Sequence, residues 1–537
     1  MFLLAGSLLV VVPARADTNV VYVGLGEDGV GGSCESPDYG VASYDNSSDA
    51  IQTALNDANE DPVIDTVHIC DSHALDEPLD MTNHESVTIE GDGHDESVIS
   101  GDPDGAGPEV GVRLFSACGV DNTYTFRNLT LTQGYGNDWG GAIQFDGTLI
   151  LDGVTVSENF AVNGGGAIDN CGNDNDSIEI YDSTFAVNDS AGEGNLGGGA
   201  ILNWGGSVTV ENSAFVDNSI DTVDAFNNIG GAIFANLIIV RGSTFEGNEA
   251  GDDGGAIYAT TDPGDETLDA GSVEVSSSRF ISNVSHDDGG AISAEGPINI
   301  RGSRFEENAA HEDGGAIDAN GGLQVVGSSF TANTIDADGE GDGGAIWVAG
   351  ALSVVSSSFE DNVAENGEFG EGGAINMDED CDGFSVQSST FTGNYAGRSG
   401  GAINFNYCLV SDTLRIATSR FTQNHSGFST GGAVDVDVDG ANQGGMLVVT
   451  GSRFTDNRAA VYAEGVDVDE LRVGGAIWTG RGRLVRNTFI GNIASTCGGA
   501  VNIRDSRVDV RLAERSNEFR RNRSAGRRST WNVCFGL

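Results

Sequence analysis

Along most of the chain, hydrophobic residues occur in short runs in which apolar and polar side chains alternate. In the run SVTVENSAF, Ser207–Phe215, the side chains of Val208 and Val210 fall on one face and that of Thr209 on the other. Alternation with a period of two residues is typical of half-buried β-strands, whereas an amphipathic helix repeats its apolar residues every three or four positions. The chain is therefore predicted to be all-β.

One stretch near the N-terminus has the helical period instead. In SSDAIQTALNDAN, residues 47–59, one helix face carries Ile51, Ala54, Leu55 and Ala58. Asp49 and Gln52 have the spacing of a capping box at the start of this helix. Because an open strand edge needs protection, we expect this helix to cap the N-terminal end of the β structure.

Two short words alternate along the chain. The word Gly-Gly-Ala followed by Ile or Val has thirteen copies spaced 24 to 43 residues apart, which begin at residues 140, 165, 198, 230, 254, 289, 314, 343, 372, 400, 431, 474 and 498. The word Phe-x-x-Asn begins at Phe185, Phe215, Phe245, Phe280, Phe305, Phe330, Phe359, Phe391, Phe421, Phe454, Phe489 and Phe519, and Val156 begins a variant of it. Units this short cannot bury an apolar face alone, so neighbouring units must stack.

The stacking that fits such a unit is a right-handed parallel β-helix, a solenoid in which each repeat is one coil and equivalent residues lie about 4.8 Å apart. We expect Phe245 to belong to a stacked aromatic core and Asn248 to an internal ladder of amides. Gly254 and Gly255 would form a tight corner with positive φ. A propeller or a sandwich would need hairpin turns at constant offsets, which the sequence does not show.

The pattern divides the chain into four parts. Residues 1–16 are predicted to be a secretory signal peptide, with an apolar stretch from Phe2 to Val12 and cleavage before Asp17. Residues 17–131 are predicted to form the N-terminal cap and irregular first coils, 132–522 the regular β-helix, and 523–537 a C-terminal tail or cap. No later segment has the roughly 20 apolar residues of a transmembrane helix.

The composition excludes some partners. The chain carries 82 Asp and Glu against 25 basic residues, all of them Arg, for a net charge of -57. Nucleic acid is therefore not expected as a partner, because a phosphate backbone requires a basic face. The eight Cys fit an oxidising compartment. Neighbouring pairing would join Cys34 to Cys70, Cys118 to Cys171, Cys381 to Cys408 and Cys497 to Cys534, although the sequence leaves the connectivity open and favours the third pair most.

The alternating Gly-Gly-Ala-Ile and Phe-x-x-Asn words, from about residue 140 to 522, resemble the repeat of the polymorphic outer membrane proteins of chlamydiae and of related secreted β-helix proteins with the pectin-lyase-like fold. The resemblance implies an exported protein, secreted or associated with the outer membrane at the cell surface, with adhesion as the usual role. Its partner would then be a cell-surface protein or a glycan.

The same fold also hosts lyases and hydrolases that act on polysaccharides, so a polysaccharide-active enzyme is the alternative function. Lyases of this fold use a basic residue as the base, but the chain has no Lys and no basic residue between Arg127 and Arg241. Close carboxyl pairs such as Asp252 and Asp253 are expected by chance among 82 acids. We therefore expect a non-catalytic protein; a self-associating surface-layer or matrix protein is a third possibility.

One set of carboxylates is regular enough to suggest a metal site. In five consecutive units, the residue before Gly-Gly is Asp253, Asp288, Asp313, Asp342 and Glu371, and Ser399 ends the series. Stacked coils would place these side chains in a column, where mutual repulsion favours a bound cation. Calcium is the candidate, and His286 and His311 could join the site. The alternative is that the carboxylates point apart into solvent.

Two further features are weaker candidates. DVDVDG, residues 435–440, imitates the start of a calcium-binding EF-hand loop, but Met446 stands at the twelfth position, where such loops have Glu, and the alternation also suits a strand with its acids outward. Several intervals between the words contain insertions, which in a solenoid often build the binding surface. We expect partner contacts from exposed aromatic residues in or near them, namely Phe226, Tyr258, Trp347 and Tyr462.

Overall fold

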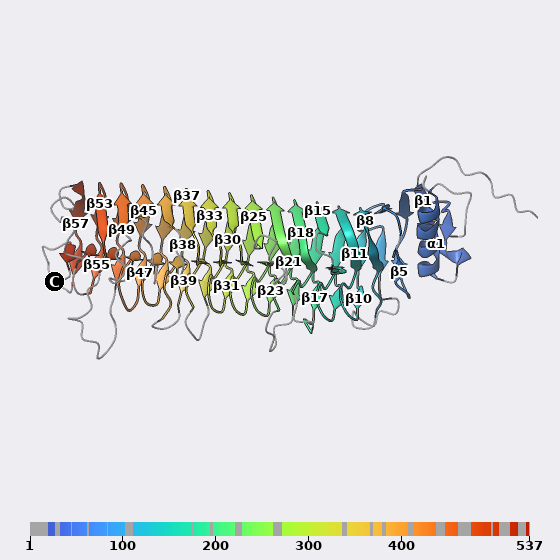
Figure 1. Ribbon diagram of the computed structural model, residues 1–537, viewed down its shortest axis with the longest axis horizontal. Coiled ribbons are helices and arrows are strands. Elements are labelled where there is room, and N and C mark those ends of the chain that lie inside the picture. The colour runs from blue at the N-terminus through green and yellow to red at the C-terminus, as the bar shows by residue number, and fades with distance from the viewer. Residues whose placement is uncertain are drawn as a thin grey trace, which may run out of the picture.

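The described residues form a long rod of parallel strands with an α-helix at its N-terminal end (Figure 1). The computed structural model describes residues 20–26, 33–44, 46–61, 64–82, 84–102, 111–172, 176–193, 197–220, 228–260, 271–335, 341–365, 369–378, 383–405, 413–436, 446–459, 474–495, 498–503, 516–524 and 533–535. The predicted all-β, right-handed parallel β-helix is confirmed. The predicted signal peptide, residues 1–16, lies outside the described residues.

One coil shows how the two words build the fold. The Phe-x-x-Asn word forms β22 (Thr244–Glu246) and leads into the short β23 (Glu249–Ala250). The Gly-Gly-Ala-Ile word turns the chain into β24 (Ile257–Ala259), and β25 (Ser272–Ser276) completes the coil. Each of these strands pairs in parallel with its equivalent one coil later, so that Phe245 lies beside Phe280 and Ile257 beside Ile292.

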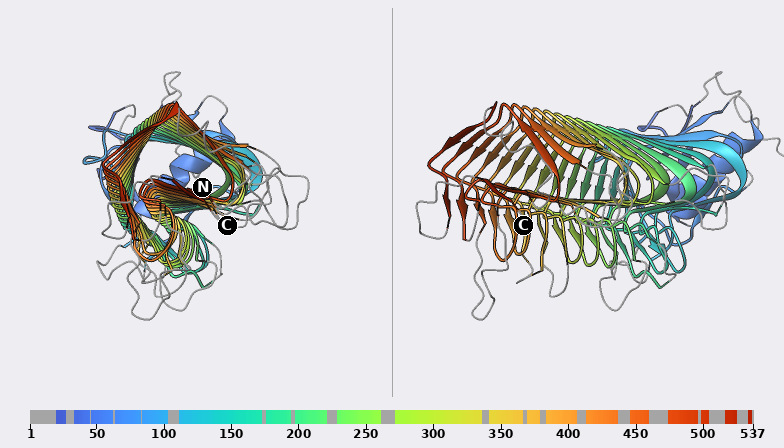
Figure 2. Two further views of the ribbon diagram at one scale, coloured as in Figure 1. Left: turned by 90° about the vertical axis from the view of Figure 1, so that its left-hand side faces the viewer. Right: turned by 60° about the vertical axis from the view of Figure 1, so that its left-hand side comes forward.

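Among the described residues, the strands make three sheets that run the length of the rod, and a view along the axis shows the coils superposed (Figure 2). A 16-stranded sheet contains β4 (His73–Ala74), β7 (Val98–Ser100), β9 (Thr130–Thr132), β12 (Thr155–Ser157), β16 (Thr184–Ala186), β19 (Ala214–Val216), β22, β26 (Arg279–Ile281), β30 (Arg304–Glu306), β34 (Ser329–Thr331), β38 (Ser358–Glu360), β42 (Thr390–Thr392), β46 (Arg420–Thr422), β50 (Arg453–Thr455), β54 (Thr488–Ile490) and β57 (Glu518–Arg520).

A 14-stranded sheet contains β10 (Tyr135–Gly136), which follows Gly134, and then the strands that follow each ladder asparagine: β13 (Phe160–Ala161), β17 (Asp189–Ser190), β20 (Ser219–Ile220), β23, β27 (Val284–Ser285), β31 (Ala309–Ala310), β35 (Thr334–Ile335), β39 (Val363–Ala364), β43 (Tyr395–Ala396), β47 (His425–Ser426), β51 (Arg458–Ala459), β55 (Ile493–Ala494) and β58 (Arg523–Ser524).

The remaining sheet has 29 strands: β1 (Val20–Gly24), β2 (Tyr39–Gly40), β3 (Thr66–Ile69), β5 (Leu79–Asp80), β6 (Val87–Gly91), β8 (Phe115–Arg127), β11 (Ile143–Asp152), β14 (Ile168–Asn170), β15 (Ser177–Tyr181), β18 (Ile201–Glu211), β21 (Ile233–Arg241), β24, β25, β28 (Ile292–Ala294), β29 (Ile298–Arg301), β32 (Ile317–Ala319), β33 (Leu323–Val326), β36 (Ile346–Val348), β37 (Leu352–Val355), β40 (Ile375–Met377), β41 (Phe384–Gln387), β44 (Ile403–Phe405), β45 (Thr413–Ala417), β48 (Val434–Val436), β49 (Met446–Thr450), β52 (Ile477–Thr479), β53 (Gly482–Val485), β56 (Val501–Ile503) and β59 (Val533–Phe535).

The core contains the two predicted ladders. From Phe185 to Phe519, consecutive phenylalanine rings stack with centroids 4.6–5.0 Å apart. From Asn159 to Asn522, each asparagine Nδ2 donates to the Oδ1 of the asparagine in the next coil over 2.8–2.9 Å. These amides satisfy one another in a turn from which water is excluded.

The two glycines of each corner serve different purposes. Gly254 has φ of +66°, as expected, so any side chain there would be strained. The prediction was wrong for Gly255, whose φ is not positive. A Cβ on Gly255 would lie 2.2 Å from the carbonyl oxygen of Gly290, so the close approach of the next coil requires glycine at this position.

The predicted capping helix is α1 (Ser47–Glu60), which buries Ile51, Leu55 and their neighbours against β1, β2, β3 and β5. Its N-cap is not the expected Asp49–Gln52 box: Asn46 accepts a hydrogen bond from the backbone N–H of Asp49 over 2.8 Å. Asparagine at this position satisfies an N–H that has no partner within the helix. In the described part of the chain, no helix has the length and apolar composition needed to cross a membrane.

Two disulfides join Cys34 to Cys70 and Cys118 to Cys171, as two of the four neighbouring pairs predicted. Of the other two pairs, Cys381, Cys408 and Cys497 lie outside the described residues, and only the backbone of Cys534 is described, in β59. Both disulfides lie in the first third of the rod, where the units are least regular.

Candidate functional site

The five carboxylates before Gly-Gly, from Asp253 to Glu371, stack in register as expected; we call them the acid column. The register is imposed by the strands that follow, because Ile257, Ile292 and the equivalent isoleucines pair coil by coil. Backbone bonds continue this register into the corner, where the Gly254 N–H donates to the carbonyl of Asp288 over 2.9 Å. The sequence words therefore bring the carboxylates together.

The carboxylates do not point apart into solvent. The Oδ1 atom of Asp253 accepts a hydrogen bond from the backbone N–H of Asp288 over 3.1 Å. Equivalent bonds of 2.7 Å link the N–H of Asp313 to Asp288, that of Asp342 to Asp313, and that of Glu371 to Asp342. Each aspartate thus caps the corner of the next coil and keeps its second oxygen for another contact.

Burial and mutual repulsion raise the pKa values of these groups. Burial, followed by repulsion from Asp288, raises the pKa of Asp253 to about 8. The same causes raise the pKa of Asp313 to about 8. Burial raises the pKa of Asp288 to about 6, and the hydrogen bond from Asp313 opposes this shift. Burial and then the Glu371 carboxylate raise the pKa of Asp342 well above its ordinary value.

The groups that could hold a cation are not successive members of the column. Asp252, Asp253 and Asp287 have carboxylate oxygens within 4.8 Å of one another, and so do Asp287, Asp288 and Glu312. Asp287 and Glu312 belong to an outer row one position earlier in each unit, which the sequence interpretation missed. Burial, then repulsion from Asp288, raises the pKa of Asp287 to about 7. Hard oxygen ligands in flexible geometry suit calcium.

The far end of the acid column already has protein partners. Glu371 is buried, with 5% of its surface exposed, and its Oε1 lies 3.2 Å from Nη1 of Arg398. Its Oε2 accepts from Nδ2 of Asn404 over 2.9 Å, and Asn376 donates to Asp342 over 3.1 Å. Among the predicted ligands, Asp342 and Glu371 are therefore served by protein donors, and the cation-competent groups lie at the Asp253–Asp313 end.

The two histidines do not join the acid column. Nε2 of His286 lies 2.8 Å from Oε1 of Glu249 in β23, at the surface. His311 is exposed, and its backbone N–H donates to the carbonyl of Asp287. In the EF-hand-like segment, Asp435 is buried in β48 and accepts from the Thr430 hydroxyl instead of facing outward, while residues 437–440 lie outside the described part of the chain.

The aromatic candidates for partner contact are only partly described. Tyr258 is 9% exposed and stacks against Phe234, with centroids 5.8 Å apart, so the expectation of an exposed ring was wrong. The turn that carries Asp253 packs over this strand, which alternation alone does not reveal. Trp347 is half-buried, and Phe226 and Tyr462 lie outside the described residues.

Two hollows mark the surface of the rod. One of about 650 Å³ lies along the edge of the 16-stranded sheet and is lined by serines and glycines with Arg279 and Arg304. Another of about 500 Å³ is lined mainly by apolar and small residues, with Arg415 at its edge. Neither lining contains Asp, Glu or His, so neither holds the carboxyl pair that a glycosidase requires.

Comparison with known proteins shows that one unit is similar to the repeat of a known family. Residues 242–260, which contain β22, β23 and the following Gly-Gly corner, match the Chlamydia polymorphic membrane protein (Chlamydia_PMP) repeat. Curated proteins give no match. A match among solved structures is the catalytic unit of a thermostable GH87 alpha-1,3-glucanase from Streptomyces thermodiastaticus strain HF3-3, 13% identical, with 91% of this chain and 67% of that chain covered and a TM-score of 0.30.

Proposed function

We propose that the chain is an exported protein that works at a cell surface and binds a partner, a surface protein or a glycan, without catalysing a reaction. The observation that carries this proposal is a constant coil interrupted by insertions of variable length at its turns, both between the asparagine and Gly-Gly and between Gly-Gly and the next Phe. The Gly-Gly word begins 6 residues after the ladder asparagine Asn492 but 17 residues after Asn457.

The insertions leave the coil unchanged. On one side of the long Asn457–Gly474 interval, Arg458 pairs with His425 and with Ile493; on the other side, Ile477 pairs with Val434 and with Val501. A frame that tolerates such variation at its turns is suited to presenting binding segments. The match of one unit to the Chlamydia polymorphic membrane protein repeat supports a location at the membrane surface.

The acid column fits a supporting role for calcium. A cation at the Asp252–Asp253–Asp287 group would offset the repulsion that raises the pKa values there. The test is thermal unfolding in EDTA, in millimolar calcium chloride and in sodium chloride of equal ionic strength. We expect a higher midpoint specific to calcium, lost in Asp287→Asn. An equal response to both salts would leave the column as screened charge only.

The binding function is tested with a variant in which three long intervals, Asn218–Gly230, Asn333–Gly343 and Asn457–Gly474, are each shortened to the length of Asn492–Gly498. A matched control keeps their lengths but replaces 461–471 with Gly and Ser. We expect wild-type protein to bind a component of a glycan array or of a panel of immobilised cell-surface proteins, and the shortened variant to lose at least about tenfold in affinity with an unchanged unfolding midpoint. Unchanged binding by the shortened variant would contradict the proposal.

The enzyme alternative is tested in parallel. The full chain is incubated with polygalacturonate and with α- and β-glucans, and new reducing ends are measured. No release above that of heat-unfolded protein is expected. Release that one carboxyl substitution abolishes would show that the chain is an enzyme instead.

A further inference from the structure

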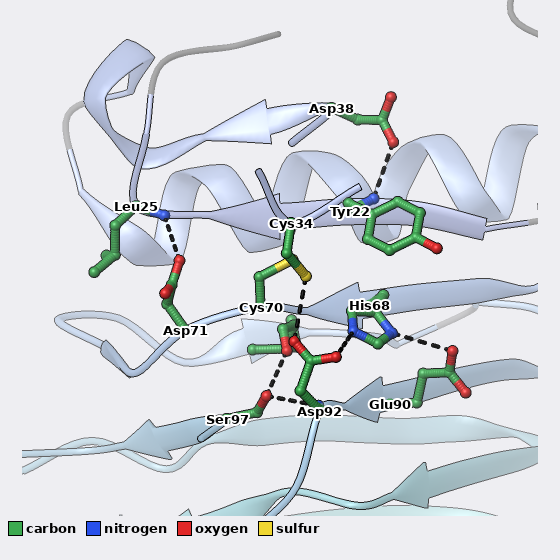
Figure 3. The surroundings of a disulfide bond; sticks show 11 residues. Tyr22, Leu25, Cys34, Asp38, His68, Cys70, Asp71, Glu90, Asp92 and Ser97 are labelled. Atoms are coloured by element: carbon green, nitrogen blue, oxygen red, sulfur yellow. Dashed lines mark hydrogen bonds and ion pairs between the residues drawn. A yellow bond between two sulfur atoms is a disulfide. The ribbon is translucent and has the colours of Figure 1, made fainter. Parts of the chain in front are cut away.

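The N-terminal end of the rod holds a cluster of metal-ligating side chains apart from the acid column. Cys34 and Cys70 form a disulfide, and His68 in β3 lies beside it (Figure 3). Strand alternation sends Val67 and Ile69 into the core and His68 to the opposite face, where only 12% of its side chain is exposed. Tyr22 in β1 covers the imidazole, with ring centroids 5.0 Å apart.

Two carboxylates hold His68 from the next coil. Nδ1 lies 3.1 Å from Oε1 of Glu90, its direct neighbour in β6, and Nε2 lies 3.0 Å from Oδ1 of Asp92. The other oxygen of Asp92 lies 3.3 Å from Sγ of Cys34. Asp92 therefore bridges the sulfur and the imidazole, as Figure 3 shows.

The positions of these atoms suit tetrahedral zinc. Both sulfur atoms and a ring nitrogen of His68 lie within 4.8 Å of one another. Zinc with bonds of about 2.0–2.3 Å needs ligand atoms roughly 3.3–3.8 Å apart. Once the S–S bond is open, small side-chain rotations bring two sulfurs, Nε2 and one Asp92 oxygen to this spacing.

Glu90 is placed to orient His68 as a zinc ligand. A zinc-bound histidine usually donates its other ring N–H to a carboxylate, which fixes the ring and its tautomer. Glu90 already occupies that position on Nδ1, leaving Nε2 to face Asp92 and the sulfurs. The Asp92 backbone N–H is in turn fixed by the Ser97 hydroxyl over 2.9 Å.

We propose that the dithiol form of Cys34 and Cys70 binds zinc together with His68 and Asp92. The two cysteines at this end of the rod are then linked either by a disulfide or through a bound zinc ion. A dithiol reductant opens the disulfide: it supplies two electrons and two protons, becomes a cyclic disulfide and leaves two thiols. Zinc binding then releases both thiol protons. A disulfide oxidant reverses the process by taking two electrons from the thiolates, which form the S–S bond as zinc leaves.

The test uses the full chain, reduced without oxygen and titrated with cobalt(II) and then zinc. Cobalt held by thiolates gives a near-ultraviolet charge-transfer band and visible ligand-field bands, which zinc abolishes. Cys34→Ser/Cys70→Ser is expected to bind one ion fewer than the wild type. The matched control, Cys118→Ser/Cys171→Ser, removes the other described disulfide and is expected to keep these bands.

Further variants separate a built site from binding by an unfolded dithiol. Asp92→Asn and His68→Gln are expected to weaken zinc binding, and Glu90→Gln, a positioning residue, to weaken it about 10–100-fold. Reoxidation should release the metal. Equal metal content in the wild type and Cys34→Ser/Cys70→Ser, insensitivity to all three of the single substitutions, or equal binding by the oxidised chain would overturn the proposal.

Discussion

Substitution of one asparagine in the middle of the ladder, Asn308→Ala, tests what holds neighbouring coils together. The Asn308 side chain is fully buried and makes four hydrogen bonds: Oδ1 accepts from N and Nδ2 of Asn283, and Nδ2 donates to Phe280 O and Asn333 Oδ1. After truncation, Asn283 Nδ2 still has Phe245 O, and Asn333 Oδ1 still accepts the N–H of residue 308. The Asn283 N–H loses its acceptor in a buried turn.

An unsatisfied buried N–H costs about 1–3 kcal/mol, and the small cavity adds roughly 1 kcal/mol. We therefore expect Asn308→Ala to lower the free energy of unfolding by about 2–4 kcal/mol. Because each coil contacts only its neighbours, the weakening should be local.

The assay is hydrogen exchange followed by mass spectrometry on peptides that contain Asn283, together with urea unfolding. Asn299→Ala, at a half-exposed position of β29 outside the ladder, is the matched control. Protection at residue 283 should fall only in Asn308→Ala. If the backbone amide of Asn283 is equally protected against exchange in both variants, the ladder does not contribute the coil-to-coil stability assigned to it.

Three further predictions follow from the core and the acid column. Phe330→Ala removes a ring stacked 4.8 Å from both neighbours and should cost about 3–5 kcal/mol in urea unfolding; a loss below 1 kcal/mol would contradict the stacked core. Gly315→Ala places a Cβ 2.3 Å from the carbonyl oxygen of Gly344 and should strongly destabilise the fold. Gly327→Ala has open space around its Cβ and should cost about 1 kcal/mol because of the positive φ at this position. Thermal unfolding that shows Gly327→Ala to be the less stable variant would refute this explanation. In EDTA, the stability of the fold should decrease as the pH rises from about 4 to 8, because folding raises the pKa of Asp253 from 3.8 to about 8 and the folded chain then binds more protons than the unfolded one. Melting curves of Asp253→Asn at several pH values should show a weaker dependence of stability on pH. An unchanged dependence would exclude Asp253 as its source.

Much of the fold could be predicted because the two words determine which residues stack. Phe245, Asn248 and Gly254 lie where the repeat places them, since a fixed offset within every unit becomes a column once the coils pack in register. The reason for glycine at residue 255 could not be predicted from the repeat, because it arises from the close approach of the next coil and not from the conformation of the local turn.

The candidate site was only partly predictable. Alternation indicates which strand residues face the core, but it does not say in which direction a side chain in a turn points. The partnership of Asp287 with Asp252 and the burial of Tyr258 both depend on how the turn folds over the following strand. The ion pair between Glu371 and Arg398 likewise links residues one coil apart, and neither residue belongs to one of the two repeated words.

The asparagine ladder has a direction. At every step from Asn159 onward, the backbone N–H and the amide Nδ2 of one coil donate toward the following coil, whose Oδ1 receives both, as in the step from Asn248 to Asn283. A coil that has already folded therefore presents a pair of donors along the axis, ready for the next asparagine to arrive. Each finished coil can therefore serve as the template for its successor, so that folding can proceed coil by coil from the N-terminal end toward the C-terminal end.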